Sequence, residues 1–572
     1  MSVKVNIVNQ NFESDYVKNL LKLRGVEDVD EYLNPTAASL LDFNLLDYIK
    51  EGRKLLQFVL NKENSKILIV VDCDVDGYTS AAIIYSYIHT IEPEQHIDYI
   101  LHEHKQHGLE DVIDKILDSD TFYDLVILPD SSSNDYEYHL ELAKIGTDCL
   151  ILDHHDLEPV EGVGHPLRAS NAVIINNQIS DNYPNKELTG AGITWQFCRA
   201  HEDLGLYPDH RGLADSLIDL AALGVCGDMG SILTPENRYI MIEGFKNVTN
   251  YFFEKAIEKK AYNMNNEVTP ISVAFYIVPM MNAMIRIGSM DEKERLFLGL
   301  IDGHRKVPCN KRGAKGTFEE VAVESLRECE NAKSRQNKIT DQMVLDLEQK
   351  IFKYNLLDNK ILFVRLNDDD DYPSEVVGLA AMKIAAKYKR PTIIARLNPE
   401  GYDRGSIRNV SDCELRDLKG FLNGSGYFEW VQGHPNAAGA SILDSNLRAF
   451  HTYANEQLKE VNFAETLYDA NFERQVNSED LVDMIYDLGG HTDVWGQGNK
   501  EPLIYIPNIY INSTSYSIIG ANKDTLRFER NGVTYIKFHA GKLIEELGKY
   551  TEARISIVGK ANLNEWMGRV TP

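Results

Sequence analysis

Three aspartates at alternate positions are the first residues of this chain whose types and spacing could do chemistry. Asp72, Asp74 and Asp76 lie in the segment VVDCDVDG, directly after a β-branched apolar run. Three carboxylates beside a buried strand repel one another, and a bound cation is the usual way to offset that repulsion. A calcium loop of the EF-hand type is excluded, because its twelfth position requires a glutamate and this chain has Ile83 there, and because such a loop follows a helix.

Three further segments carry aspartate or histidine at the end of an apolar run. Asp130 ends VILPD, the sequence Asp153, His154, His155 and Asp156 ends DCLILDHHD, and Asp228 follows LAALGVCG. Each segment alone also has a structural interpretation, as a turn, a pair of surface histidines or a helix cap. Together the carboxylates and the imidazole describe a site for two hard divalent cations, which oxygen and nitrogen ligands hold in hydrolases.

The elements that must position these residues alternate between apolar strands and helices. Apolar runs at 66–71, 124–130, 148–156 and 172–176 have the length and composition of buried strands, and helical patterns lie between them. This alternation predicts a doubly wound parallel sheet, in which ligands bind beyond the carboxyl ends of the strands. The polar residues that end the strands are therefore expected at one edge of the sheet.

Changes in composition divide the chain into five predicted regions. We expect an N-terminal helical region at 1–60, an α/β domain with the parallel sheet at 61–300, a basic loop and long connector helix at 301–355, a smaller α/β domain at 356–465, and a β-barrel at 466–572. The barrel prediction depends on short strands separated by turn signals.

Charge, cysteine content and hydropathy bear on partners and compartment. The chain has 59 basic and 87 acidic residues and a net charge of -28, which opposes a nonspecific nucleic-acid coat but not an enzyme with a basic groove. Its seven scattered cysteines argue against a disulfide framework or a zinc ribbon, and we expect them to be small core residues. No window approaches the apolar length of a transmembrane helix and no signal-peptide pattern is visible, so we predict a cytoplasmic protein with no membrane partner.

The motifs, in this order, resemble the signature motifs of the DHH phosphoesterase superfamily. Similarity to its RecJ branch of single-strand-specific exonucleases extends through most of the chain: YPNKELTGAG (183–192), VPMMNAMIRIG (278–288), EVVGLAAMKIAAKYKRP (375–391), GSIR (405–408), GHPNAAG (433–439) and GQGNKEP (496–502). The resemblance assigns 61–300 to a DHH catalytic domain, 356–465 to a DHH-associated substrate-binding domain, and 466–572 to an oligonucleotide-binding (OB) domain. Departures are Gln432 for the first glycine of GGH, Lys383 for the usual arginine, and HEHKQHGL (102–109) for PxRxxEGYGL, with Lys105 as the basic replacement and no tyrosine.

The resemblance implies a metal-dependent exonuclease that acts on single-stranded DNA. The enzyme would digest the strand from 5′ to 3′ and release nucleoside 5′-monophosphates. It would act in DNA replication, recombination or repair, and its further partners would be replication or repair proteins. Two Mn²⁺ or Mg²⁺ ions would lower the pKa of a shared water and neutralise charge on the phosphodiester. Asp74 and Asp130 would hold one ion, and Asp76, Asp130, His154 and Asp228 the other, with Asp130 bridging.

The remaining site residues follow from the same resemblance. Asp72 would support the ligands and His155 would contact the scissile phosphate. The other phosphate-binding residues would be Lys105, Arg286, Ser406, Arg408 and His434, of which Arg286, Ser406, Arg408 and His434 would act across an interdomain cleft. Trp495 and Trp566 are candidate stacking platforms for bases, with buried core positions as the alternative.

Two other functions stay open at this stage. A DHH phosphodiesterase for short oligonucleotides or cyclic dinucleotides would use the same ligands, although such proteins typically stop after the GGH domain and this chain continues for about a hundred residues. A non-catalytic replication accessory protein is the other alternative, and the presence of every expected ligand counts against it. The sequence also leaves open the choice between DNA and RNA and between Mn²⁺ and Mg²⁺.

Overall fold

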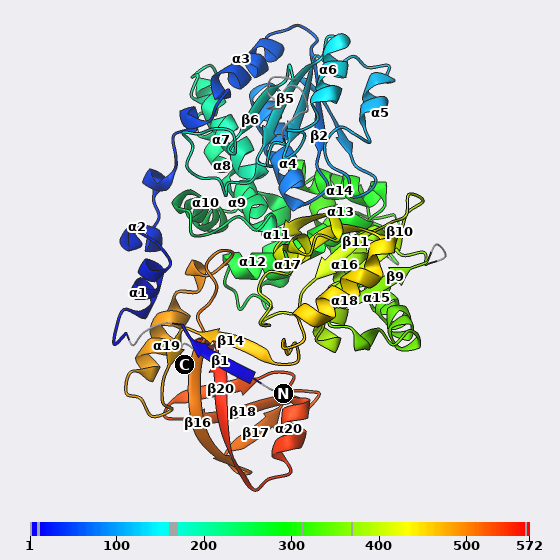
Figure 1. Cartoon of the computed structure of the whole chain (residues 1–572). Coiled ribbons are helices and arrows are strands. Elements are labelled where there is room, and N and C mark those ends of the chain that lie inside the picture. Colours follow the sequence, from blue (N-terminus) through cyan, green and yellow to red (C-terminus); the bar gives the residue numbers. More distant parts are fainter. Residues whose placement is uncertain are drawn as a thin grey trace. The chain divides into compact units, whose positions relative to one another are not determined.

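The computed structural model describes residues 3–8, 12–158, 170–311, 313–314, 316–367, 370–566 and 569–572. The chain divides into two compact units (Figure 1). We call Arg24–Arg335 with Asp493–Lys500 unit A, and Met1–Leu23 with Gln336–Thr492 and Glu501–Pro572 unit B.

The centre of unit A is a parallel sheet that confirms the predicted fold class. In the described part of the chain its five strands run in the order β3-β2-β4-β5-β6, and every neighbouring pair is parallel. The strands are β2 (Lys66–Val71), β3 (His96–Leu101), β4 (Leu125–Pro129), β5 (Asp148–Asp153) and β6 (Val173–Asn176). The sequence did not predict β3, because this edge strand is only half-buried and its sequence, HIDYIL, lacks a continuous apolar run.

Helices pack closely against this sheet and against one another. The helix α4 (Val75–Ile91) follows β2 and contacts both α7 (Gly190–Glu202) and α9 (Ile218–Gly227). The apolar run before Asp228 is α9, so Asp228 follows a helix, whereas the other three acidic segments lie at the ends of strands β2, β4 and β5. The run is apolar on all sides because α9 is buried between its neighbours.

One stretch of unit A has the length and composition of a membrane span, contrary to our expectation. It is Pro270–Ile287, which comprises α12 (Pro270–Tyr276) and α13 (Val278–Ile287). Half of it is buried inside the protein, and residues such as Val273 and Met281 belong to the hydrophobic core of unit A. A core helix passes the same test of length and composition, so this stretch is weak evidence for a membrane span.

The predicted connector helix is present as α15 (Val321–Lys353), which is 33 residues long. It follows α14 (Met290–Ile301) and a two-stranded antiparallel hairpin, β7 (Lys306–Pro308) and β8 (Phe318–Glu320), which occupies the basic segment expected to be a loop. Arg312 and Lys315 of that segment lie outside the described residues.

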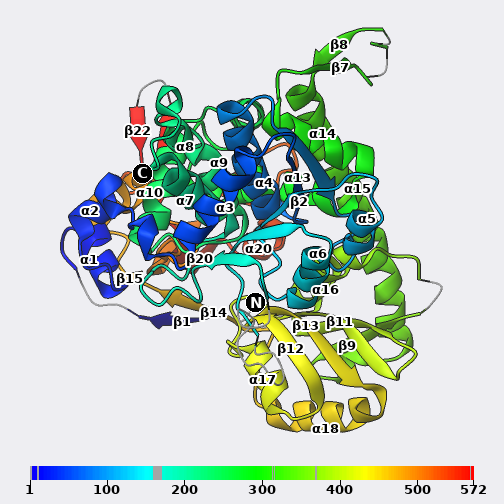
Figure 2. The same cartoon turned by 90° about the horizontal axis from the view of Figure 1, so that it is seen from above.

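Unit B contains a second, mixed sheet of five strands in its described residues, in the order β12-β13-β11-β10-β9. The strands are β9 (Leu362–Leu366), β10 (Thr392–Leu397), β11 (Tyr402–Arg408), β12 (Phe428–His434) and β13 (Ala437–Leu443). Only β9 and β10 are parallel, joined through α16 (Ser374–Tyr388), and the other pairs are antiparallel. The helices α17 (Leu418–Gly424) and α18 (Leu447–Gln457) share its apolar core, and Figure 2 shows α18 beside the strands.

The C-terminal part of unit B is rich in short strands, as predicted. One ladder joins β15 (Phe472–Glu473), β16 (Ile504–Asn512) and β20 (Glu552–Gly559). A second joins β17 (Tyr516–Ile519), β18 (Thr525–Arg530) and β19 (Val533–Lys537), and β21 (Asn564–Trp566) pairs with β22 (Arg569–Thr571). Two helices are inserted, α19 (Leu481–Gly490) and α20 (Gly541–Leu547).

The N-terminal sixty residues are not purely helical, which corrects the prediction for this region. They begin with β1 (Val3–Ile7), which pairs in parallel with β14 (Thr466–Ala470). The helices α1 (Tyr16–Leu23), α2 (Val29–Leu33) and α3 (Ile49–Leu60) follow. The strand was missed because its partner lies more than four hundred residues away, and five residues alone carry little periodic signal. The expectation for the cysteines holds: all seven are free, and all but the half-buried Cys309 are buried.

Candidate metal centre

The strands β2, β4 and β5 deliver their polar residues to one edge of the sheet in unit A, as the sequence predicts. After β2 the chain turns at once into α4, where the side chain of Asp74 caps the helix by accepting from the backbone N–H of Gly77, 3.1 Å away. A Cβ on Gly77 would lie 2.5 Å from that of Asp72, so only glycine permits this tight turn.

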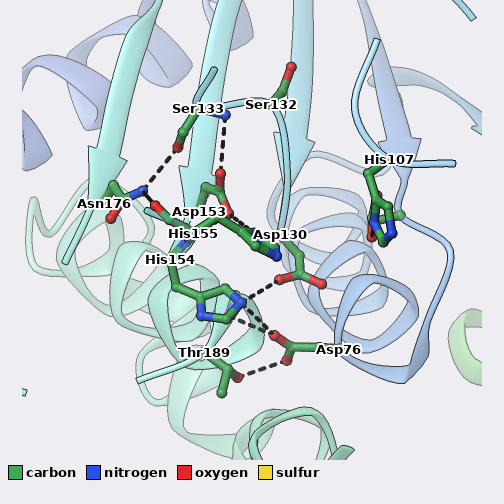
Figure 3. Close-up of polar contacts among 12 residues, drawn as sticks. Asp76, His107, Asp130, Ser132, Ser133, Asp153, His154, His155, Asn176 and Thr189 are labelled. Atoms are coloured by element: carbon green, nitrogen blue, oxygen red, sulfur yellow. Dashed lines mark hydrogen bonds and ion pairs between the residues drawn. The ribbon is translucent and has the colours of Figure 1, made fainter. Parts of the chain in front are cut away.

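Four of the predicted ligands converge on one point, and Figure 3 shows three of them, Asp76, Asp130 and His154. The Nε2 atom of His154 lies 3.2 Å from a carboxylate oxygen of Asp130, 3.6 Å from one of Asp228 and 3.9 Å from one of Asp76. The ligand atoms of Asp76, His154 and Asp228 lie within 4.8 Å of one another.

A second group adjoins the first. One carboxylate oxygen from each of Asp72, Asp74 and Asp130 lies within 4.8 Å of the others. Asp130 therefore neighbours both groups, which is the arrangement that a carboxylate bridging two ions requires. The structure thus brings together all five predicted ligands.

Asp130 carries the clearest sign of a missing positive charge. It is buried, and its Oδ1 atom lies 3.2 Å from Nε2 of His154 but accepts no well-aligned hydrogen bond among the described residues. Burial, followed by the charges of Asp76 and Asp74, raises its pKa well above the ordinary range. Its φ of 69° lies in the left-handed region, which costs a residue other than glycine about 1–3 kcal/mol. A divalent cation would compensate this buried charge, so the site fits the predicted ions.

The start of α7 holds Asp76 in place. The hydroxyl of Thr189 and the backbone N–H of Ala191 donate to Oδ1 of Asp76, and the N–H of Gly190 donates to Oδ2 from 2.7 Å. Positive helix N-termini favour carboxylates, so this contact fixes the ligand's orientation. Gly190 is also required by space, because a Cβ there would lie 2.4 Å from Oδ1 of Asp130.

Asp228 completes the centre from the carboxyl end of α9. Its side chain is partly exposed, and burial together with the charges of Asp76 and Asp74 raises its pKa to about 8. In the same helix, Asp219 accepts hydrogen bonds from the backbone N–H groups of Thr249 and Asn250, so its role is structural.

Asp153 organises the two histidines that follow it. It is fully buried and accepts from the backbone N–H groups of His154 and His155 and from Nδ1 of His155, which is 2.8 Å away. Burial alone would lower the pKa of His155, but the Asp153 carboxylate outweighs it and raises that pKa to about 9. Burial and the charge of His155 lower the pKa of His154, and a neutral imidazole is the form that binds a metal ion.

His107 is a site residue that sequence reasoning missed. Its Nδ1 atom lies 2.7 Å from Oδ2 of the buried Asp72, and this hydrogen bond is the main cause that raises the pKa of His107 to about 11. It lies in the segment HEHKQHGL, where Lys105 was selected as the basic residue. Lys105 is exposed on the same loop, between β3 and α5 (Ile113–Leu117).

A cavity of about 340 Å³ lies beside the metal ligands. It is formed by the loops that follow β3, β4 and β5. Its lining residues are His107, Gly108, Ser132, Ser133, Asn134, Asp135, Asp153, His155 and Asp156.

The predicted phosphate-binding residues fall into two groups. Arg286 lies in the last turn of α13 in unit A, where its Nε atom is buried without a hydrogen-bond partner among the described residues. Ser406, Arg408 and His434 lie in unit B. Arg408 on β11 and His434 on β12 are both paired with Ala437 of β13, which places them in one cross-strand row.

The structure tests one of the two predicted stacking platforms, Trp495, and does not support it. Trp495 is buried in unit A and packs against the guanidinium of Arg24, 5.6 Å from the ring centroid, so the core interpretation holds for this residue. The side chain of Trp566 lies outside the described residues.

Comparisons with known proteins agree with this geometry. Residues 66–225 match the model of the DHH family, N-terminal domain, and residues 469–572 match that of the RecJ OB domain. The chain is 34% identical to the SPbeta prophage-derived single-strand DNA-specific exonuclease YorK of Bacillus subtilis (strain 168), over 99% of this chain and 96% of the relative. It is 26% identical to the single-stranded-DNA-specific exonuclease RecJ of the same organism, over 97% of this chain and 66% of that protein.

Among solved structures, RecJ of Thermus thermophilus has the same fold. Its complex with Mn²⁺ matches with a TM-score of 0.70 and 19% identity, covering 100% of this chain and 78% of the other. Its complex with Mg²⁺ matches with a TM-score of 0.64, covering 100% of this chain and 77% of the other.

Proposed function

The chain belongs to the RecJ family of single-strand-DNA-specific exonucleases, and on that premise we propose that it hydrolyses single-stranded DNA from one end with two divalent metal ions. The observation that carries the proposal is the convergence of Asp76, Asp130 and Asp228 on Nε2 of His154. Mn²⁺ and Mg²⁺ are the proposed ions, because RecJ of Thermus thermophilus forms complexes with both and because oxygen ligands with one imidazole suit either.

We propose that digestion proceeds from 5′ to 3′ and releases nucleoside 5′-monophosphates. Such products require that water adds to phosphorus and that the bond from phosphorus to O3′ breaks. The released nucleotide leaves with a 3′-hydroxyl, and the shortened strand keeps a 5′-phosphate. Each turnover therefore regenerates the same kind of end, which suits repeated cleavage along one strand.

The side chains at the edge of the sheet have distinct parts in this reaction. Asp74 and Asp130 would hold one ion, and Asp76, Asp130, His154 and Asp228 the other. When bound, the two ions lower the pKa of a water molecule and neutralise the charge that develops on the phosphodiester. Asp153 holds His155 through Nδ1, so that Nε2 of His155 can donate to a phosphate oxygen. Asp72 and the start of α7 keep the metal ligands oriented.

Substrate binding would involve both units. We propose that Arg286 of unit A and Ser406, Arg408 and His434 of unit B contact backbone phosphates, with Lys105 as a further basic contact. Guanidinium groups suit this role because they pair with phosphate oxygens through two hydrogen bonds. The C-terminal strands, which match the RecJ OB domain, would recruit the single strand.

Digestion of a long single strand labelled separately at its 5′ and 3′ ends tests the proposal. With Mn²⁺ present, we expect immediate release of the 5′-labelled mononucleotide, while the matching duplex is spared. Release from the 3′ end first would overturn the polarity. Activity confined to a dinucleotide would favour a phosphodiesterase of small substrates, and no activity on any substrate would favour an accessory protein.

The setting of this activity is also a proposal. We propose that the enzyme acts in DNA replication, recombination or repair, together with proteins of those processes. A cytoplasmic location accords with this role, and the free, mostly buried cysteines suit a reducing compartment. Co-purification from cells with single-strand-binding or replication proteins, and fractionation of the cell, would test the two statements.

A further inference from the structure

The loop between β3 and α5 (residues 102–112) is held in a defined position beside the metal centre. Lys293 of α14 is buried, and its Nζ donates to the backbone carbonyl oxygens of His102 and Glu103. Farther along, the N–H of Leu109 donates to Oδ2 of Asp135 from 2.8 Å. A loop held near both ends presents its side chains in fixed places, which is the condition for building a binding site on it.

His107 is the side chain of this loop that reaches the metal centre. Its Nδ1 atom and Oδ2 of the buried Asp72 are 2.7 Å apart, which leaves no room for an ion between them. Cys73 Sγ lies 3.7 Å from Nε2, a distance at which a thiol interacts only weakly. A zinc site made of these three residues is therefore disfavoured, and Nε2, whose contact with the Cys73 sulfur is weak, is the nitrogen that a stronger acceptor can take.

A second histidine has the same arrangement at the same cavity. Nδ1 of His155 lies 2.8 Å from Oδ1 of the buried Asp153, and both His107 and His155 line the cavity of about 340 Å³. Both imidazoles are about half exposed, at 47% and 51% of the side chain. Figure 3 shows that His155 follows β5, whereas His107 comes from a different segment. A carboxylate that accepts from Nδ1 fixes the tautomer and orientation of a histidine and leaves Nε2 for the ligand.

We propose that His107 binds a backbone phosphate of the DNA strand, acting at the same cavity as His155. A phosphate fits because its several oxygens can accept hydrogen bonds from two imidazoles at once. Three aspartates line the cavity. Oδ2 of Asp135 accepts from Leu109 and from the hydroxyl of Ser132, Asp153 accepts from His155, and Asp156 is exposed to solvent. The role is particular to this chain, because the segment that carries His107 departs from the RecJ pattern described above. The inference rests on the proposed function, which brings a DNA strand to this edge.

Two substitutions of the same residue separate phosphate binding from support of Asp72. In His107→Asn the amide nitrogen takes the place of Nδ1, so the hydrogen bond to Asp72 is kept and the cavity loses its donor. In His107→Gln the amide nitrogen takes the place of Nε2, so the donor to the cavity is kept and the bond to Asp72 is lost. His104→Asn is the matched control, because His104 is exposed on the same loop and makes no side-chain hydrogen bond within the described residues.

The dissociation constant for a fluorescent oligothymidylate is measured by anisotropy, with Asp130→Ala present in every protein to stop hydrolysis. KM and kcat are measured without that substitution. We expect His107→Asn to raise the dissociation constant and KM about tenfold with little change in kcat, the effect of one lost hydrogen bond to a charged group. His107→Gln should raise them less, and His104→Asn not at all.

Other outcomes assign the residue differently. Unchanged binding and KM in His107→Asn would overturn the proposal. A loss of kcat in His107→Gln, with normal binding and a changed Mn²⁺ dependence, would assign His107 to the support of Asp72 and would overturn it as well. If the unsubstituted chain digests no strand, the proposed function fails, but the binding comparison still decides whether His107 contacts the strand.

Discussion

Two regions differ in how the charges of their polar groups are compensated. One is the edge of the unit A sheet that carries the metal ligands, which we call the metal edge, and the other is the Arg408–His434 row of unit B. At the metal edge, Asp72, Asp76 and Asp130 are buried and their pKa values are raised mainly by burial. In the row of unit B, Arg408 is half-buried and His434 is exposed on antiparallel strands. The first region is unfavourable without cations, whereas the second is stable as it is and suits an anion. Chemistry and strand binding are therefore expected to respond to different substitutions.

Asp130→Ala should produce the largest effect, at the metal edge. We expect hydrolysis to fall roughly a thousandfold or more, the scale on which loss of one charge-stabilising group acts in hydrolases. The metal-free variant should melt no lower than the unsubstituted protein, because it removes a buried carboxylate that lacks compensation. End-label digestion and thermal melting in EDTA measure the two effects.

Asp209→Ala is the control, since Asp209 is an exposed aspartate of the same unit. Substantial Mn²⁺-dependent activity in Asp130→Ala would contradict the bridging role. A large fall in melting temperature would contradict the view that this edge is strained without metal.

Gly190→Ala should disturb the same edge through a steric clash, because it removes no ligand and changes no charge. The added Cβ would lie 2.4 Å from Oδ1, 2.5 Å from Cβ and 2.7 Å from the backbone Cα of Asp130, so the whole of Asp130, backbone included, must shift away from α7. We expect Mn²⁺ affinity and activity to fall about 10–100-fold, the range seen when the support of a metal ligand is lost. Calorimetric titration with Mn²⁺ measures the affinity.

Gly424→Ala in unit B is the matched control. In the described chain no atom lies within 4 Å of a Cβ at Gly424, and the residue ends α17. This variant should bind Mn²⁺ and digest DNA normally. Equal behaviour of the two glycine variants would mean that the close packing around Asp130 has no functional role.

The sequence predicted the metal edge better than its surroundings, for physical reasons. Buried parallel strands have continuous apolar runs and end at one edge, so Asp130 and the DHH residues could be placed from pattern alone. His107 could not, because its partner Asp72 is 35 residues away and no periodicity links a loop to a strand end. The edge strand β3 is half-exposed and β1 pairs with distant β14, so neither has a local signature.

Arg408→Ala should have a smaller effect on activity than the changes at the metal edge, and it should act on substrate binding and not on the chemical step. The guanidinium packs against α16, where a Cβ on Gly378 would lie 2.4 Å from Nη2 of Arg408, so its position is fixed. Loss of one phosphate contact should raise KM about tenfold and leave kcat nearly unchanged.

The salt dependence provides a second readout for Arg408→Ala. The slope of log KM against log salt concentration should become shallower by about 0.7, the value for one phosphate contact on a single strand. Arg448→Ala, an exposed arginine on α18 of the same unit, should change neither quantity. A fall in kcat with unchanged KM would place Arg408 in the chemical step and would remove the division between the two regions.

The smallest expected effect is on the pH dependence of stability in the metal-free protein. The pKa of Asp228 is raised from 3.8 to about 8 by burial and by the charges of Asp76 and Asp74, and that of His155 is raised from 6.5 to about 9. Between the unfolded and folded pKa values the folded state binds a proton that the unfolded state lacks, so stability falls as pH rises. The buried His139 and His201, whose pKa values burial lowers to about 4, lose their protons only in the unfolded state near pH 6.5, so they add an opposing slope that fades as pH rises further. The pKa of His107, raised to about 11 mainly by its hydrogen bond to Asp72, adds to the fall throughout the interval.

We therefore expect the melting temperature in EDTA to fall by roughly 2 °C between pH 6.5 and pH 8. The shift is small because a protein of this size has a large unfolding entropy, and the change in melting temperature is the change in free energy divided by that entropy. Asp228→Asn should reduce the fall, because the amide does not titrate, and should leave the part that comes from His155 and His107. Saturating Mn²⁺ should flatten it too and raise the melting temperature, since a ligand that binds only the folded state stabilises it. A melting temperature that rises over this interval, or one that Mn²⁺ leaves unchanged at pH 8, would show that the acidic edge of unit A is already balanced by groups of the protein, and would remove the contrast with unit B.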